Sequence, residues 1–291
     1  MIVKAYAKIN VYLDVISKRE DGYHNLEMVM LPLELHDTIE IESLIGLKDS
    51  YVTCDHVELQ ETKYNLINTT VCKLRDLYHF KQNFNIKVHK EIPISAGLGG
   101  GSSNAAAALK AFNHLLKLKI DEEKMNEIAK TIGADVPFCL YNKPALVKGI
   151  GEEITPINLK TQYNVLIIKP ERGLSTKHVF EKADSIELDH GDVNKVVDAL
   201  KKGDDDLLAE SMFNSLEKAS LQMVPEIQDV KDMLKKDGLK MVMMSGSGSA
   251  VYALSRDFNK MKTLYKKYEK AGFEVYLTKT LAQLPTNKLR K

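Results

Sequence analysis

The first third of the chain alternates apolar and polar residues in the manner of β-strands. Apolar side chains occupy every second position of residues 5–15, with Lys8 and other polar residues between them. A period of two over about eleven residues predicts a strand with one buried and one polar face. An Asp-Gly pair at 21–22 then predicts a hairpin turn, because it tolerates the positive φ that such turns need. We expect further strands at 24–33 and 37–42.

A glycine-rich loop stands between helix-like segments in the middle of the chain. Residues 65–80 repeat apolar side chains at helical spacing, which predicts an amphipathic helix. A strand-like alternation at 83–89 leads toward the loop at 97–103, and an alanine-rich helix follows that loop directly. A further helix is expected at 122–132 and a short buried strand at 163–169.

The second half of the chain predicts helices first and then strands around a second Gly/Ser-rich loop. The expected helices are at 192–202, 205–219, 225–237 and 257–271, the expected strands at 240–244, 250–254 and 273–278, and the loop at 245–249. Because the order of elements changes between the two halves, we predict two domains, 1–160 and 161–291.

The charge balance and the apolar runs exclude several classes of protein. Among 291 residues, 41 lysines and arginines face 40 aspartates and glutamates, for a net charge of +1. Phosphate backbones demand a clustered excess of positive charge, so we expect no nucleic-acid partner. The N-terminus lacks a signal peptide's apolar core, and no run approaches the roughly 20 apolar residues that span a bilayer. We expect a cytoplasmic protein without a membrane partner, present as a monomer or a weak homodimer.

The spacing of the cysteines and histidines does not indicate a metal centre. Cys54, Cys72 and Cys139 are an odd number without CxxC spacing, which fits neither a disulfide framework nor a structural zinc site. Free thiols in a reducing cytosol are the plain interpretation. An acidic run at 204–206 more simply caps the helix that it precedes.

The glycine-rich loop offers phosphate-binding chemistry. Four of the five residues 97–101 are glycine, and Ser102 and Ser103 follow. Successive N–H groups of such a turn converge on phosphate oxygens, and the next helix adds a favourable dipole. The loop is not a Walker A motif, because no Lys-Ser/Thr pair follows at the right spacing. It is not a dinucleotide motif either, because Ser102 replaces the third glycine. A tight strand-to-helix turn is the structural alternative.

Asp135 and Lys8 are candidate catalytic residues with simpler alternatives. Asp135 could cap a short helix that begins at Val136, which the local sequence favours, or act as a general base, and the two roles are compatible. Lys8 shares a strand face with Asn10, so both could reach one ligand, although most such lysines are solvated. Nothing in the spacing pairs Lys8 with Asp135.

Two further segments carry open alternatives. Tyr23 and His24 could stack on a planar base and hydrogen-bond to it, or form an ordinary surface pair. The loop at 245–249 is either a second anion or substrate contact or a turn between strands. The methionines at 241–244 suit a core better than a soft-metal site.

Five segments in a fixed order resemble the GHMP kinases over about residues 1–280. They are Ala7-Lys8-Ile9-Asn10, Asp21-Gly22-Tyr23-His24, Pro93 to Asn104, Gly133 to Pro137 and Ser245-Gly-Ser-Gly248. The resemblance implies an α+β fold of two domains. The N-terminal α+β domain would carry the glycine-rich phosphate loop, and the C-terminal domain would place helices on an antiparallel sheet.

The same resemblance implies ATP-dependent phosphorylation of a small molecule. The first two segments single out the branch that acts on the 2-hydroxyl of a cytidine-diphosphate-linked methylerythritol, on the non-mevalonate route to isoprenoid precursors. Asp135 would accept or orient the hydroxyl proton, and Lys8 would favour the developing alkoxide. Mg²⁺ would accompany ATP, with Ser103 as a candidate ligand.

The resemblance also assigns binding residues for both substrates. For ATP they are Asn65, Leu66, Ile67, Lys90, Pro93, Ile94, Ser95, Ala96, Gly97, Leu98, Gly99, Gly100, Gly101, Ser102, Ser103 and Asn104. For the acceptor they are Asn10, Tyr23, His24, Phe180, Gly246, Ser247 and Gly248. Many members carry an aromatic residue where Met30 stands, so packing beside the cytidine would be softer here. The alternatives are another GHMP small-molecule kinase and a catalytically inactive nucleotide-binding regulator.

Overall fold

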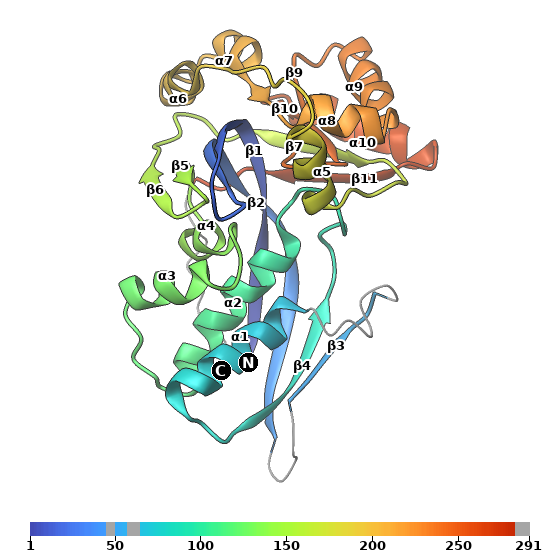
Figure 1. Ribbon diagram of the computed structural model, residues 1–291. Coiled ribbons are helices and arrows are strands. Elements are labelled where there is room, and N and C mark those ends of the chain that lie inside the picture. The colour runs from blue at the N-terminus through green and yellow to red at the C-terminus, as the bar shows by residue number, and fades with distance from the viewer. Residues whose placement is uncertain (45–49, 57–64, 283–291) are drawn as a thin grey trace.

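Two sheets with helices packed against them make up the protein (Figure 1). The computed structural model describes residues 1–44, 50–56 and 65–282. The larger sheet has seven strands, with the path β3-β4-β2-β1-β8, while β5 pairs with β2 and β6 with β5. Its strands are β1 (Ile2–Lys18), β2 (His24–Leu44), β3 (Tyr51–Cys54), β4 (Asn83–His89), β5 (Ala145–Gly149), β6 (Glu153–Pro156) and β8 (Phe213–Asn214).

The helices of the first half pack on one face of this sheet. They are α1 (Leu66–Tyr78), α2 (Gly100–Leu115), α3 (Glu122–Lys130) and α4 (Val136–Tyr141). The alanines of α2 are almost all buried, because small side chains let the helix lie close to β1. This helix begins at the glycine-rich loop, so its packing fixes the position of the loop.

The second sheet is antiparallel throughout, in the order β11-β7-β10-β9. Its strands are β7 (Asn164–Lys169), β9 (Met241–Met244), β10 (Val251–Ser255) and β11 (Glu274–Lys279). The helices of this half are α5 (Thr176–Ala183), α6 (Val193–Lys202), α7 (Asp205–Ser211), α8 (Glu217–Met223), α9 (Glu226–Lys236) and α10 (Phe258–Lys270). The expected α+β class with an antiparallel second sheet is therefore confirmed.

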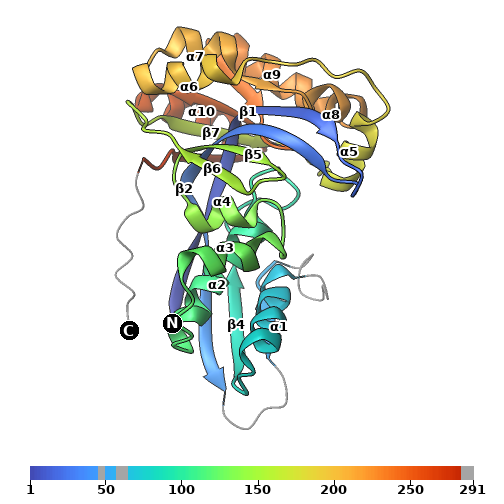
Figure 2. The ribbon, with the colours of Figure 1, turned by 60° about the vertical axis from the view of Figure 1, so that its left-hand side comes forward.

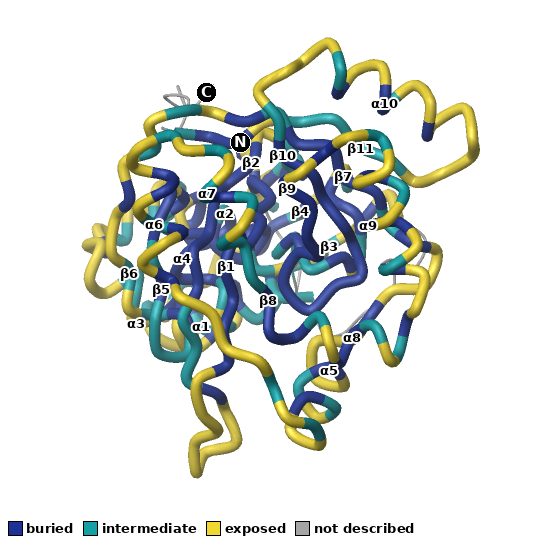
Figure 3. Tube along the Cα trace, turned by 90° about the horizontal axis from the view of Figure 1, so that it is seen from above, coloured by how far each residue is buried: buried dark blue, intermediate teal, exposed yellow. Residues whose placement is uncertain are grey.

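The β1–β2 hairpin joins the two halves. Figure 2 shows it extending from beneath α2 to the neighbourhood of α5 and α8. Its central residues, 5–15 in β1 and 28–33 in β2, are buried, so both faces of the hairpin are covered there, as the dark central trace in Figure 3 shows. The expected half-buried strand was therefore wrong, because a second core covers the polar face.

Bulges in β1 redirect its apolar side chains between the two cores. The register shifts between Tyr6 and Lys8, and again between Asn10 and Tyr12. Leu13 packs in the core with α1 and α2, whereas Tyr12 packs in the core beneath the second sheet. A bulge reverses the facing of the residues beyond it, which a strict period of two does not reveal.

Several element boundaries differ from the expected ones. β2 is continuous through both of its predicted strands. The predicted helix at 205–219 is interrupted by β8, which pairs in parallel with β1 at Tyr12 and Leu13. The methionines at 241–244 are buried, as expected. Among the described residues, no helix has the length and apolar character needed to cross a bilayer.

Candidate active site

A cavity of about 990 Å³ lies where the glycine-rich loop, the hairpin and the second half of the chain meet. Most of the residues singled out from the sequence line it. They are Lys8, Tyr23, His24, Asn65, Leu66, Lys90, Pro93, Ile94, Ser95, Ala96, Gly97, Leu98, Gly99, Gly100, Gly101, Ser102, Asn104, Asp135, Phe180, Gly246 and Ser247. Segments that are far apart in the sequence therefore line the same cavity.

The glycine-rich loop leads directly into α2. Gly99 is the residue before the helix, with a left-handed φ of 71° and no side chain to occupy the helix N-terminus. A Cβ on Gly99 would approach Cγ of Lys8 to 2.9 Å, and one on Gly100 would approach Nζ of Lys90 to 3.1 Å. The loop therefore places open backbone and a helix dipole between two lysines, an arrangement suited to an anion.

Lys8 and Asp135 face each other in the cavity. Nζ of Lys8 lies 3.3 Å from Oδ2 of Asp135 and donates to Oδ1 of Asn10 at 2.8 Å. Lys8 is only 4% exposed, so the interpretation of a solvated lysine was wrong. Its backbone N–H donates to the Leu98 carbonyl at 3.0 Å, which ties β1 to the glycine-rich loop.

Asp135 precedes α4 but does not cap it with its side chain. The helix begins at Val136, as expected, yet the Asp135 carboxylate makes no cap hydrogen bond. The cap interpretation was therefore wrong for this side chain, which is 31% exposed and directed to Lys8. Burial, and then the Asp135 charge, raise the pKa of the nearby Cys139 to about 12. That thiol stays neutral and is not a nucleophile of the site.

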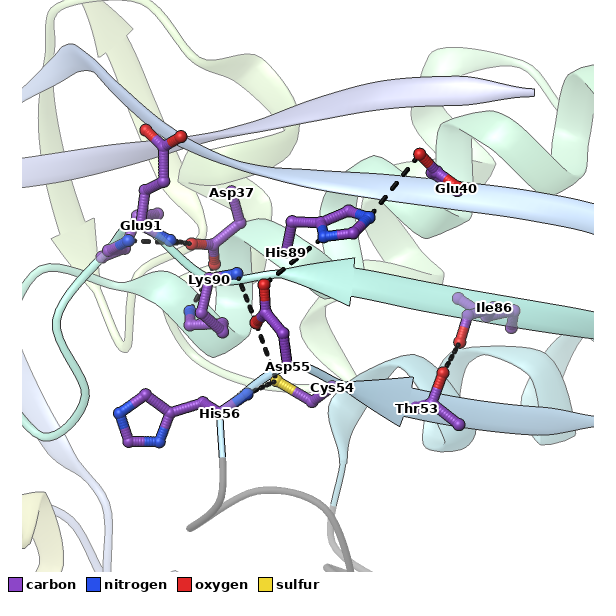
Figure 4. A network of polar contacts seen from close by, with 11 residues as sticks. Asp37, Glu40, Thr53, Cys54, Asp55, His56, Ile86, His89, Lys90 and Glu91 are labelled. Carbon is purple, nitrogen blue, oxygen red and sulfur yellow. Dashed lines mark hydrogen bonds and ion pairs between the residues drawn. The ribbon is translucent and has the colours of Figure 1, made fainter.

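A buried carboxylate anchors the segment before the glycine-rich loop (Figure 4). Asp37 is 0% exposed and pairs with the Lys90 ammonium. Its other oxygen accepts hydrogen bonds from the backbone N–H groups of Glu91 and Ile92, at 2.9 and 2.8 Å. Asp55 adds a bond from the Lys90 N–H at 3.0 Å. Lys90 therefore lines the cavity with its charge already paired.

A second loop from the C-terminal half closes the cavity wall beside Lys8. Oγ of Ser245 donates to the Gly97 carbonyl at 3.0 Å. A Cβ on Gly97 would collide with the Ser245 carbonyl oxygen, and one on Gly246 would lie 3.2 Å from Nζ of Lys8. The two glycine-containing loops are thus in backbone contact.

The hairpin tip and α5 form the other end of the cavity. The His24 and Phe180 rings lie 4.8 Å apart between centroids, while Tyr23 is 57% exposed. Nε2 of His24 bonds with Oδ1 of Asp184 at 2.7 Å, and Nζ of Lys18 donates to Oδ2 of Asp184 at 2.6 Å. The Lys18 bond and then the His24 bond hold the pKa of the Asp184 carboxyl below its usual value.

Some of the expected site residues lie outside the cavity lining. Asn10, Ile67, Ser103 and Gly248 do not line it, nor does Met30, which is fully buried in the core. Asn10 is buried and accepts a hydrogen bond from Lys8, and Ile67 is a core residue in the first turn of α1.

The expected Mg²⁺ ligand, Ser103, lies outside the cavity lining. The Ser103 hydroxyl donates to the Tyr6 carbonyl, while Ser102 lines the cavity. Within the described part of the chain, no three His, Cys, Asp or Glu side chains could together hold a metal ion. A Mg²⁺ ion commonly takes one or two protein ligands and the rest from phosphate and water, so a nucleotide-borne ion does not need such a cluster.

Sequence reasoning missed the residues that hold the site from behind. Asp37 lies in a strand with ordinary alternation, Asp184 at the end of α5, and Asn214 in a segment predicted to be helical. None belongs to a motif of its own. The break at β8 was the one detectable signal, because Asn and Ser favour turns and caps over helix interiors.

Protein-family models and known proteins match both halves of the chain. The model described as "GHMP kinases N terminal domain" matches residues 65–143, and "GHMP kinases C terminal" matches residues 196–274. A protein of Clostridium botulinum (strain Eklund 17B / Type B) named 4-diphosphocytidyl-2-C-methyl-D-erythritol kinase is 35% identical over 97% of this chain and 100% of its own. A Clostridioides difficile (strain 630) protein of the same name is 37% identical, over 92% of each chain.

Solved structures give the same grouping. A crystal structure of 4-(cytidine 5'-diphospho)-2C-methyl-D-erythritol kinase superposes with a TM-score of 0.78 at 29% identity, covering 96% of this chain and 99% of that one. Homoserine kinase from Cytophaga hutchinsonii superposes with a TM-score of 0.72 at 18% identity, covering 96% and 94%. At that lower identity the second match concerns the fold alone.

Proposed function

The chain belongs to the 4-diphosphocytidyl-2-C-methyl-D-erythritol kinases of the GHMP kinase family, and we propose that it transfers the γ-phosphoryl group of ATP to the 2-hydroxyl of 4-diphosphocytidyl-2-C-methyl-D-erythritol. The observation that carries this proposal is the Lys8–Asp135 pair, 3.3 Å apart, beside a glycine-rich loop at a helix N-terminus. A general base, a cation and an anion cradle are what phosphoryl transfer to an alcohol requires.

Asp135 and Lys8 divide the work at the acceptor hydroxyl. The Asp135 carboxylate accepts or orients the hydroxyl proton, and it is exposed enough to reach a ligand in the cavity. The Lys8 ammonium stabilises the negative charge that develops on the oxygen. Because Lys8 is buried and tied to Asn10 and the Leu98 carbonyl, it needs little reorganisation to do so.

The glycine-rich loop and its surroundings bind ATP in this proposal. ATP supplies the phosphoryl group, with Mg²⁺ held mainly by phosphate oxygens and water. Loop N–H groups and the α2 dipole hold the phosphates, while Asn65, Leu66 and Lys90 lie toward the adenosine. Asn104 supports the fit, because its buried Oδ1 has no partner among the described residues and the residue lines the cavity.

The hairpin tip and α5 recognise the cytidine end of the acceptor. Phe180, whose ring lies tilted beside that of His24, and the exposed ring of Tyr23 provide two aromatic surfaces. A planar base stacks well between such rings, and the exposed Tyr23 is free to adjust to it. Met28 and Leu26, rather than Met30, supply the softer apolar wall there.

The first experiment measures acceptor-dependent ADP release. Purified protein is supplied with ATP, Mg²⁺ and one acceptor: the cytidine-diphosphate methylerythritol, homoserine or mevalonate. We expect release with the first acceptor alone. Release with homoserine or mevalonate instead would identify another GHMP kinase. ATP binding with no release in any case would indicate a nucleotide-binding regulator.

Asp135→Asn separates chemistry from binding. The amide keeps the shape of the side chain but cannot take a proton, so we expect kcat to fall by roughly 10²- to 10⁴-fold. The Kd values for ATP and acceptor, measured by calorimetry, should change little. Asp121→Asn, a change at the N-cap of α3, is the matched control and should leave kcat unchanged. Wild-type turnover in Asp135→Asn would exclude the proposed role.

A further inference from the structure

The second loop, residues 245–249, is held by a group of buried polar side chains that makes no motif in the sequence. They come from the segment between α7 and α9, the first part of which lies in the helix expected at 205–219. Asn214 of β8 is 5% exposed, and Ser220 of α8 is fully buried. Both direct their side chains at the backbone of the loop or of the strand that leads into it.

The Asn214 amide has all of its hydrogen-bonding groups satisfied. Nδ2 donates to the Met244 carbonyl at 3.1 Å and to the Gly246 carbonyl at 2.8 Å. Oδ1 accepts from the Leu216 N–H at 3.1 Å. These three hydrogen bonds require two donors and one acceptor on a short side chain, and asparagine supplies them. Aspartate would lack the donors, and serine would supply one donor at most.

Two neighbours act on the same stretch of backbone. Oε1 of Glu217 accepts from the Met244 N–H at 2.9 Å, and its other oxygen pairs with Lys231. Oγ of Ser220 donates to the Ser247 carbonyl at 3.3 Å. Carbonyls of residues 244, 246 and 247 are therefore directed toward this side of the loop.

The opposite side of the loop faces the catalytic pair. A Cβ on Gly246 would lie 3.2 Å from Nζ of Lys8 and 2.9 Å from the Gly97 carbonyl oxygen. The backbone at Gly246 therefore lies beside the Lys8 ammonium, with no room for a side chain between them. A shift of this loop by a fraction of an ångström would change the space beside the ammonium and the contact with the glycine-rich loop together.

We propose that Asn214 is a positioning residue for phosphoryl transfer, which acts by holding the Gly246 carbonyl so that the second loop confines the Lys8 ammonium beside Asp135. Asn214 does not line the cavity, and its side-chain hydrogen bonds go to backbone groups of Met244, Gly246 and Leu216. Its anchorage is firm, because β8 is paired with β1 at Leu13, five residues beyond Lys8 on the same strand. The inference rests on the proposed function.

The test compares Asn214→Ala with a matched asparagine. Nδ2 of Asn164 likewise donates to two carbonyls, those of Ser255 and Arg256, both at 3.2 Å, but at the far end of the second sheet. For Asn214→Ala we expect kcat to fall roughly 10- to 100-fold, since misplacement of this order has such effects. KM for ATP and for the acceptor should change less than about threefold. Asn164→Ala should lose stability without losing kcat.

Hydrogen–deuterium exchange gives a readout that does not depend on the reaction. Peptides covering 245–250 should exchange faster in Asn214→Ala than in wild type or in Asn164→Ala. If the wild type phosphorylates no tested acceptor, the proposed function fails while this comparison still tests the hold of Asn214 on the loop. Unchanged exchange there, or kcat equal to that of Asn164→Ala, would overturn the inference.

Ser220→Ala covers the case in which Asn214→Ala does not fold. It removes one hydroxyl from the same loop and preserves the rest of the segment. We expect kcat to fall about two- to tenfold, the equivalent of one hydrogen bond, with KM unchanged and faster exchange at 245–250. Unchanged kcat and exchange in a folded Ser220→Ala protein would contradict the proposal.

Discussion

The two glycine-containing loops meet beside Lys8, but they are built for different tasks. The N-terminal loop, residues 97–101, continues into the 16-residue helix α2, whose dipole and first N–H groups face the cavity. The C-terminal loop, residues 245–249, joins β9 to β10 without a helix. Similar composition therefore leads to a helix N-terminus at the cavity in one place and a tight connection between strands in the other.

The backbone hydrogen bonds make the difference concrete. In and just after the C-terminal loop, the N–H groups of Ser245, Gly248, Ser249 and Ala250 donate to carbonyls of the protein, two of them at Ser95 and Ala96. N–H groups already used in this way are unavailable to an anion. Glycine allows close backbone approach at Gly97 and in the C-terminal loop, whereas Gly99 and Gly100 leave the backbone open toward the cavity.

The loops are also held in different ways. A buried carboxylate, Asp37, holds the segment before the N-terminal loop through Lys90 and two N–H groups. A neutral amide, Asn214, holds the C-terminal loop through two carbonyls. Breaking a buried ion pair costs more than breaking neutral hydrogen bonds, because it leaves an unpaired charge. The N-terminal anchor should therefore be the more sensitive to substitution.

The largest effect is expected where the loops touch. Gly97→Ala would place a Cβ against the Ser245 carbonyl oxygen, at a φ of 73° that disfavours side chains. We expect a loss of more than about 4 kcal/mol in the free energy of unfolding, measured with urea. Gly272→Ala has a φ of 85° but nothing within 4 Å, so it should cost only about 1–2 kcal/mol. Equal losses would mean that the loops can separate.

The next effect distinguishes the two anchors. Asp37→Ala leaves the Lys90 ammonium buried without its partner, and we expect a loss of about 3–5 kcal/mol in the free energy of unfolding. Asp206→Ala breaks the exposed pair with Lys240 and should leave the free energy of unfolding nearly unchanged, because water screens such a pair. If Asp37→Ala were as mild as Asp206→Ala, the carboxylate would not be the anchor of the N-terminal loop.

The smallest effect concerns a contact between β10 and β1. The Tyr252 hydroxyl donates to the Asn10 carbonyl at 2.7 Å. Tyr252→Phe removes this bond and should cost about 1 kcal/mol. Burial raises the pKa of Tyr252 well above its usual value. A raised folded-state pKa means that the contribution is complete below the unfolded pKa and is lost as pH rises through the folded one. The wild-type advantage should thus be constant between about pH 6 and 9; a decline within that range would contradict this assignment.

The periodic elements and the loops could be predicted from local sequence patterns. Helix α1, strand β4 and helix α10 agree closely with their predicted ranges, because each carries a clear period and a local start or stop signal. The glycine-rich loop and the helix after it could also be predicted, since the effects of glycine and alanine on the backbone are local. The Asp204 cap could be predicted too, and its side chain accepts a hydrogen bond from the Leu207 N–H.

Which side chains meet depends on how distant segments of the chain pack together. Lys8 and Asp135 are 127 residues apart in the chain and 3.3 Å apart in space, a contact that no local pattern encodes. The burial of Lys8 depends on the second core, and the break in the helix at 205–219 depends on β8 pairing with β1. Propensity and period describe one segment at a time. Distant segments pair with the same backbone groups, and this pairing fixes the bulges, the contact between the loops and the anchors Asp37 and Asn214. These features therefore form only when the whole chain packs.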